Sequence, residues 1–309
     1  GLYSDQKLKD IQDIILACAG IVAESIVSQP NYVIDDSFNV TNEIIKRAPG
    51  IEVKVISIDG KPINEDIAES QTKKYTDQKV SDHWTQPYWL EKPNSLGKFD
   101  VEAKNYGRPE NADNPTTQFV LSVGGLEIEF NKPVEYRFVD PVQGEVYQPV
   151  TISPALTGSM SSNQALLKPQ EKKSFNLTIK NNSARNQTAD LTFMQSDGIE
   201  ISPSTVSLEV PANQSIDTSF EISNPKNTES SDIQPLLNGE PITGIKKIKY
   251  QHIPDITWFP PLSLKVKALE INNPLKKIGY IHGAGDLIPE ALENIGVQVD
   301  LLNSNLLAV

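Results

Sequence analysis

The sequence is poor in cysteine and histidine. Its 309 residues include one cysteine, Cys18, so no disulfide can form within the chain. The three histidines, His83, His252 and His282, lie far apart, and none has the neighbouring ligands that a zinc site needs. We therefore expect no metal ion and no cofactor to bind to these residues.

Positive charge and long apolar runs are also scarce. The chain has 28 Lys and Arg residues against 40 Asp and Glu residues, which gives a net charge of -12. This charge opposes binding to nucleic acid and to anionic lipid surfaces. No run of about 18 apolar residues, the length of a transmembrane helix, occurs. We therefore expect neither a nucleic-acid partner nor insertion into a membrane.

Sequence motifs for catalysis are missing as well. There is no Gly-x-Ser-x-Gly, no His-Glu-x-x-His and no cysteine–histidine pair at a suggestive spacing. Glu127 and Glu129 share one face of a predicted strand, roughly 7 Å apart, but glycosidase carboxylates come from converging elements in a cleft. An exposed strand face explains this pair better, so we assign no catalytic residue.

Short segments of alternating polarity dominate residues 144–272. Five of them are separated by turn residues, and their apolar members are Phe175, Leu177, Ile179, Leu191, Phe193, Ile199, Ile201, Val206, Leu208, Val210, Phe220 and Ile222. A period of two places these side chains on one face of each strand. Short strands at roughly ten-residue spacing predict an Ig-like antiparallel β-sandwich, which later strands at 245–253 and 262–269 would complete.

The preceding part of the chain predicts a helix and a first β-sandwich. Residues 31–143 carry several strand patterns, and Gly124-Gly125 between FVLSV and LEIEF predicts a tight hairpin. Residues 4–28 predict one amphipathic helix within an N-terminal segment, 1–30, that packs on this sandwich. Its apolar stripe consists of Leu8, Ile11, Ile15, Cys18, Val22 and Ile26. On this stripe Cys18 would be a small buried apolar residue.

The last residues, 273–309, change to a β-α-β pattern. Residues 277–281 predict a strand, 287–295 a helix that Asp286 can cap, and 297–301 a second strand. One such unit is too small to fold alone, which predicts the truncated start of a parallel α/β domain. The chain begins Gly-Leu-Tyr-Ser and ends without a polar tail, and we expect it to be cut from a larger polypeptide.

An aromatic cluster offers the best candidate for a ligand surface. Trp84, Tyr88 and Trp89 lie within six residues of one another, next to His83. Sugar rings stack on exposed aromatic faces, and neighbouring polar groups hold their hydroxyls. These four residues form the candidate carbohydrate-binding site. The alternative is that the rings pack between the helix and the sandwiches.

Four landmarks and the opening helix carry a family resemblance. They are QPYWL at 86–90, PVQGE at 141–145, YQHIP at 250–254 and IGYIHGAGD at 278–286. In this order, and over nearly the whole chain, the sequence resembles the region C-terminal to the catalytic domain in large PIG-L (LmbE-like) family deacetylases of the Bacteroidota type. The resemblance also implies Ig-like domains of the kind that accompany carbohydrate-active enzymes, and an amidotransferase-like C-terminal segment.

The resemblance implies a role for the chain but no chemistry of its own. The parent proteins are hydrolases, zinc-dependent de-N-acetylases of N-acetyl sugars, whose catalysis depends on a His-Pro-Asp-Asp-Glu motif. That motif is absent here, so zinc is expected only in a catalytic domain outside this chain. The implied partner is that adjacent domain of the same polypeptide, together with a glycan, and the implied location is the periplasm or cell surface.

The sequence leaves three hypotheses for the function. The first is a non-catalytic scaffold or accessory region of a PIG-L-like deacetylase. The second is a carbohydrate-binding β-sandwich module that uses the Trp84, Tyr88 and Trp89 cluster. The third is part of an amidotransferase-like enzyme whose active site lies beyond residue 309.

Overall fold

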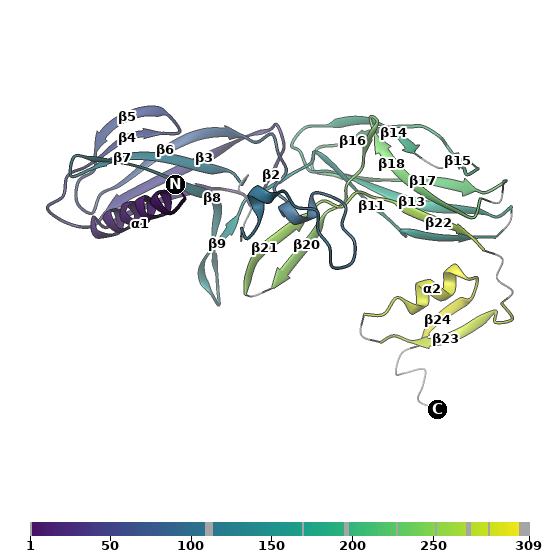
Figure 1. Ribbon diagram of the computed structural model, residues 1–309. Coiled ribbons are helices and arrows are strands. Elements are labelled where there is room, and N and C mark those ends of the chain that lie inside the picture. Colours follow the sequence, from purple (N-terminus) through teal and green to yellow (C-terminus); the bar gives the residue numbers. More distant parts are fainter. Residues whose placement is uncertain are drawn as a thin grey trace. The chain divides into compact units, whose positions relative to one another are not determined.

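The computed structural model describes residues 2–108, 114–168, 170–194, 198–226, 228–250, 252–269, 273–283 and 285–302. In these ranges the chain is mainly β, with an N-terminal helix and a C-terminal β-α-β segment (Figure 1). It divides into two compact units: Gly1–Ala155 with Ile245–Phe259, and Leu156–Gly244 with Pro260–Val309. Each unit contains a largely antiparallel β-sandwich with its own apolar core, so the predicted fold class is confirmed.

The first unit starts with a helix, α1 (Leu2–Cys18), and continues as strands. In chain order these are β1 (Ile21–Val27), β2 (Asn31–Val33), β3 (Ser37–Lys46), β4 (Val53–Ile58), β5 (Lys61–Asp66), β6 (Thr72–Val80), β7 (Thr116–Val123), β8 (Leu126–Asp140), β9 (Gly144–Pro149) and β10 (Thr151–Ser153). Two short 3-10 helices, η1 (Tyr88–Leu90) and η2 (Ala103–Asn105), lie between β6 and β7.

Strand β8 joins the two layers of this sandwich. It pairs with β7 from Leu126 to Pro133, and from Val134 onward it pairs with β1 and β9. The resulting strand order is β5-β4-β7-β8-β1-β3-β6, with β9 added to β8. Side chains of both layers meet in a core in which Phe119 and Leu121 of β7 pack with Ile44 of β3, and a second buried cluster contains Phe38 and Ile152.

The hairpin predicted at Gly124-Gly125 is confirmed. Strands β7 and β8 are antiparallel, with Val123 opposite Leu126, so these two glycines form the whole loop. Both have positive φ, 57° and 84°, which is the conformation that a two-residue type I′ turn needs at both positions. Glu127 and Glu129 are exposed on either side of the buried Ile128, as expected for an exposed strand face.

The predicted N-terminal helix over residues 4–28 is wrong in its second half. Helix α1 ends at Cys18, and Gly20 (φ 62°) turns the chain into β1. A side chain at Gly20 would lie 2.7 Å from the backbone nitrogen of Ala48, so only glycine fits this turn. The β-branched residues after it favour a strand. Their outward-facing members Val22 and Ile26 happen to continue the helical spacing, which explains the error.

The predicted burial of the helix stripe is also wrong. Leu16 and Ala19 enter the core at the end of α1, but Leu8, Ile11 and Ile14 are 58%, 54% and 60% exposed. Cys18, expected as a small buried residue, is exposed. The helix therefore contacts the sandwich through its last turn and presents most of its apolar face to solvent.

The domain boundaries differ from the predicted ones. Strand β9, which lies after the expected boundary at 143, pairs with β8 and extends the first sandwich, so the first unit continues to Ala155. The segment at 245–253 was expected to complete the second sandwich. It instead forms a hairpin of β20 (Lys246–Tyr250) and β21 (Ile253–Trp258), which belongs to the first unit.

The second unit is built on the alternating segments. Its sandwich strands are β11 (Leu156–Met160), β12 (Gln164–Leu167), β13 (Lys172–Asn181), β14 (Gln187–Met194), β15 (Glu200–Ser202), β16 (Val206–Val210), β17 (Ser215–Ser223), β18 (Ser230–Leu237), β19 (Glu240–Pro241) and β22 (Leu264–Ala268). One sheet has the order β11-β13-β17-β15 and the other β12-β22-β18-β14-β16, with β19 added to β18. Every apolar residue named from the alternating pattern lies in, or packs against, the core between them.

The C-terminal β-α-β segment is also present. Strands β23 (Lys277–Ile281) and β24 (Gln298–Leu302) are parallel, and α2 (Ile288–Asn294) connects them. The expected cap is wrong: no side chain caps α2, and the Asp286 carboxylate instead accepts a hydrogen bond from the Tyr280 hydroxyl at 2.8 Å. Among the described residues, no helix is long and apolar enough to cross a membrane.

Tyr75 on β6 gives the first unit a predicted sensitivity to alkali. Burial, the charge of the Glu65 carboxylate and a hydrogen bond to it raise the pKa of Tyr75 from 10.0 to about 12. Because the pKa is higher in the folded state, the resulting stability is present below pH 10.0 and lost as the pH rises towards about 12. In urea unfolding, Tyr75→Phe should reduce the loss of stability over this window. Identical pH dependence of the wild type and Tyr75→Phe would contradict the assignment.

Candidate functional site

The predicted aromatic cluster lies on a segment that is anchored at several points within the first unit. The Thr85 backbone donates to the Ile152 carbonyl at 3.1 Å, and the Ile152 backbone donates to the Thr85 hydroxyl at 2.8 Å. The Trp258 indole donates to the Leu90 carbonyl at 3.2 Å. These bonds fix both ends of residues 85–90 against β10 and β21, so the side chains between them are held before any ligand binds.

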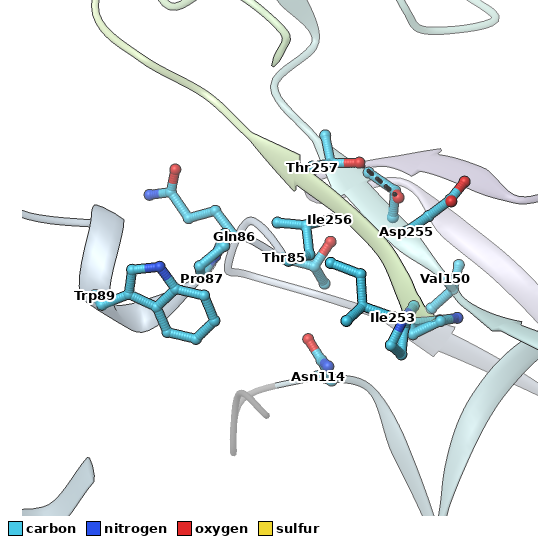
Figure 2. A pocket seen from close by; sticks show the side chains of 13 residues that line it. Thr85, Gln86, Pro87, Trp89, Asn114, Val150, Ile253, Asp255, Ile256 and Thr257 are labelled. Atoms are coloured by element: carbon cyan, nitrogen blue, oxygen red, sulfur yellow. Dashed lines mark hydrogen bonds between the residues drawn. The ribbon is translucent and has the colours of Figure 1, made fainter. Parts of the chain in front are cut away.

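A pocket of about 410 Å³ opens between this segment and strand β21. Its lining residues are Thr85, Gln86, Pro87, Trp89, Asn114, Pro149, Val150, Thr151, Ile253, Pro254, Asp255, Ile256 and Thr257 (Figure 2). All of them belong to the first unit. Apolar side chains make up most of the wall, and amides and hydroxyls supply the rest. A mainly apolar pocket with a few polar groups is the usual form of a small-molecule site.

The two faces of β21 differ in chemistry. Ile256 points towards the segment that carries Thr85 and Trp89, whereas the Asp255 side chain points away from it (Figure 2). The Asp255 carboxylate forms an ion pair with Lys249 at 2.5 Å. The Trp89 side of the pocket is therefore bounded by Ile256 and not by the carboxylate, which suits an uncharged ligand.

Trp89 is held by its neighbours in the 3-10 helix η1. The Tyr88 ring packs edge-to-face against the Trp89 indole, with centroids 5.0 Å apart and an interplanar angle of 89°. The Tyr88 hydroxyl in turn donates to the Arg108 carbonyl at 2.9 Å. Tyr88 thus holds the Trp89 ring in position and does not itself line the pocket.

The other two predicted site residues lie apart from the pocket. Trp84 packs edge-on against the buried Phe259, with ring centroids 5.9 Å apart, and it is 36% exposed. His83 is exposed, and its Nδ1 lies 3.1 Å from the Asp82 carboxylate. Of the four residues proposed from the sequence, Trp89 therefore lies in the pocket wall, and Tyr88 contacts the Trp89 ring.

Sequence reasoning missed the opposite wall of the pocket. Asn114, Val150 and residues 253–257 come from parts of the chain that are distant in sequence. The predicted strand at 245–253 ended where β21 begins, and nothing in its pattern identified which unit the segment joins. A useful sign was the aromatic pair Trp258-Phe259 at the end of β21, since Trp258 bonds to the segment that carries Trp89.

Ligands for a metal ion do not gather in the described residues. Within those ranges no group of three or more His, Cys, Asp or Glu side chains is arranged to hold one. The arrangement around Trp89 can instead hold a ring with one apolar face, because the indole supplies the contact surface and Asn114 supplies an amide on the same lining. The Gln86 amide oxygen accepts a hydrogen bond from the Phe259 backbone at 3.4 Å.

Comparison with known proteins gives no family for this chain. No protein-family model matches the sequence, and no curated protein matches it. Among solved structures, red sea bream transglutaminase is similar over 81% of this chain and 31% of its own, with 9% identity and a TM-score of 0.33. Methylamine-reacted Salmonella alpha-2-macroglobulin is similar over 80% of this chain and 16% of its own, with 10% identity and a TM-score of 0.29.

A third similar structure comprises domains 4 and 5 of the S-layer protein SbsC. It covers 58% of this chain and 88% of its own, with 10% identity and a TM-score of 0.22. The chain thus spans less than a third of the transglutaminase and about a sixth of the macroglobulin. At these TM-scores the similarities carry no argument about fold, ligand or partner, so any function proposed for this chain depends on its own residues.

Proposed function

We propose that the chain is a non-catalytic accessory region that binds a neutral glycan in the pocket beside Trp89. The observation that carries this proposal is the position of an anchored indole in the wall of a pocket of about 410 Å³, with Gln86 and Asn114 on the same lining. A pyranose ring has an apolar face of C–H groups and a rim of hydroxyls. The indole suits the face of C–H groups, and the Asn114 amide suits the hydroxyls.

The anchoring of residues 85–90 favours binding as well. Hydrogen bonds to Ile152 and from Trp258 fix the segment before a sugar arrives. Less conformational entropy is then lost on binding, and this loss is a main cost for a ligand with few contacts. The direction of the Asp255 side chain, away from Trp89, favours an uncharged ring over an amino sugar with a free ammonium group (Figure 2).

Isothermal titration calorimetry of the full chain tests this proposal. Suitable probes are the trisaccharides of glucose and of N-acetylglucosamine, with the acyclic polyol sorbitol as a hydroxyl-rich control that lacks the pyranose ring. We expect saturable one-to-one binding of at least one trisaccharide, and no heat from sorbitol. If neither trisaccharide binds at millimolar concentration, the glycan-binding proposal fails.

The exposed face of α1 supports a second candidate function, a scaffold for the catalytic domain of a PIG-L-like deacetylase. Leu8, Ile11 and Ile14 form an apolar stripe that the described part of the chain leaves uncovered. Such a stripe normally packs against another surface. The family resemblance of the sequence suggests which partner could cover the stripe: the catalytic domain of the same polypeptide.

Two measurements test the scaffold proposal. The chain with added Zn²⁺ should release no acetate from N-acetylglucosamine derivatives, because the chemistry would lie in the partner domain, and clear turnover would contradict this. Ile11→Lys should leave the melting temperature of this chain unchanged, since Ile11 is 54% exposed. A matched change in the core, Leu16→Lys, should lower it strongly, because Leu16 is 8% exposed. Equal losses in both variants would show that α1 packs on its own unit.

A further inference from the structure

The face of the β20–β21 hairpin that points away from residues 85–90 is basic, although the chain as a whole is acidic. Strand β20 contains Lys246, Lys247 and Lys249 within four residues, whereas the whole chain has a net charge of -12. Side chains alternate along a strand, so Lys247 and Lys249 share one face and Lys246 lies on the other. Accordingly, the Lys246 ammonium lies 5.8 Å from the centroid of the Trp258 ring, which belongs to the face that packs on residues 85–90.

A second cavity lies on the face of Lys247 and Lys249. Its volume is about 240 Å³, and its lining includes Asn31, Tyr136, Phe138, Gln148, Lys247 and Lys249, all from the first unit. The Tyr136 and Phe138 rings are stacked, with centroids 5.5 Å apart and planes at 17°. This cavity therefore combines aromatic surface, two amides and two ammonium groups.

The charges in this cavity do not cancel. Asp255 also lines it, and its carboxylate is ion-paired with Lys249 at 2.5 Å. Lys247 lies opposite Thr257 in the hairpin, and it forms no ion pair with any residue in the described ranges. One positive charge is thus left at Lys247, beside the amides of Asn31 and Gln148.

We propose that this cavity is a second binding site, which takes an acidic sugar whose anionic group pairs with the Lys247 ammonium. The anionic group can be the carboxylate of a uronic acid or a sulfate ester, because either is a strong acceptor for a lysine point charge. Asn31 and Gln148 supply hydrogen bonds for hydroxyls, and the Tyr136 ring supplies an apolar contact. The two cavities share the wall formed by Pro149, Thr151, Asp255, Ile256 and Thr257, but Trp89 and Asn114 line only the first, and Lys247, Asn31 and Gln148 line only the second. Binding at Lys247 therefore does not depend on binding at Trp89.

Titrations of the full chain with four probes test this site: methyl glucuronide, glucose 6-sulfate, methyl glucoside and inorganic sulfate. We expect the two acidic sugars to bind and Lys247→Met to weaken them about tenfold or more, the effect of losing a charge-assisted contact. Lys246→Met removes the same charge from the opposite face of the same strand, so it should change the affinity less than twofold. The tighter of the two acidic sugars then identifies the preferred anionic group.

The outcomes separate this site from the Trp89 pocket. Trp89→Ala should leave glucuronide binding unchanged while it removes trisaccharide binding, so either proposal can fail alone. Equal binding of methyl glucoside and methyl glucuronide would overturn the second site. Equal losses in Lys246→Met and Lys247→Met would overturn it too, because they would show general charge attraction. Inorganic sulfate binding as tightly as the sugars would mean an adventitious ion only.

Discussion

Trp89→Ala is expected to weaken the binding of a neutral trisaccharide by about 30-fold or more. This corresponds to about 2 kcal/mol, the loss typical of a central aromatic contact in a binding site. Trp89 lines the pocket from a short helix whose neighbours are hydrogen-bonded to β10 and β21, and among the described lining residues it is the only aromatic one. Titration calorimetry of the wild type and the variant measures the effect.

Two further variants separate loss of contact from loss of fold. Trp84→Ala removes an indole that packs on Phe259 and does not line the pocket, and it should change the affinity less than threefold. Trp89→Phe keeps an aromatic ring and should recover part of the binding. If Trp84→Ala costs as much affinity as Trp89→Ala, the aromatic segment is a structural element and the pocket is not the site.

Asn181→Ala is expected to lower the free energy of unfolding of the second unit by about 3–5 kcal/mol. Asn181 is fully buried at the end of β13, and its amide nitrogen donates to the carbonyls of Arg185, Val210 and Pro211 at 2.8, 2.9 and 3.2 Å. Its amide oxygen accepts from the backbone and hydroxyl of Ser183, both at 2.9 Å. Alanine removes all five hydrogen bonds. The Arg185 and Pro211 carbonyls and the Ser183 hydroxyl keep other partners, so the cost comes from the buried groups that lose theirs, about 1–3 kcal/mol each.

The matched control is Asn176→Ala. Asn176 lies on the same strand, but its side chain is exposed, so the change should stay within about 0.5 kcal/mol. Native-state hydrogen exchange gives the measurement, because it reports each unit separately. Asn181→Ala should speed exchange at Phe175–Ile179 and leave Phe119–Val123 of the first unit unchanged. A loss below about 1 kcal/mol would contradict the role assigned to Asn181.

Periodicity in the sequence predicted the sandwich cores well. Residues such as Leu177, Leu208 and Ile222 alternate with polar neighbours, and all three are buried in the second unit. The hairpin at Gly124-Gly125 could be predicted for a similar reason, since two adjacent glycines satisfy a turn that few other residues tolerate. These features depend on local conformation and on the burial of one face of a strand. Both can be recognised from the sequence, the first by turn residues and the second by alternating polarity.

Features that depend on distant pairing were not predictable in this way. The strand pattern at 245–253 does not reveal that this segment joins the first unit and not the second, or that a second strand, Ile253–Trp258, pairs with it. The helix end at Cys18 was missed because Val22 and Ile26 fit a helical stripe and an outward-facing strand equally well. The candidate site shows both cases: Trp89 could be named from its aromatic neighbours, whereas Asn114 and Ile256 reach the same pocket only through the folded topology.

The most direct measurement of the glycan-binding proposal is a nuclear Overhauser experiment on the full chain with a bound trisaccharide. The chain has three tryptophans, Trp84, Trp89 and Trp258, so their indole protons can be assigned with single substitutions. We predict transfer between the C–H protons of a sugar ring and the ring protons of Trp89, with none to Trp84. Transfer to Trp84 without transfer to Trp89, or binding with no contact to any indole, would contradict the proposed site.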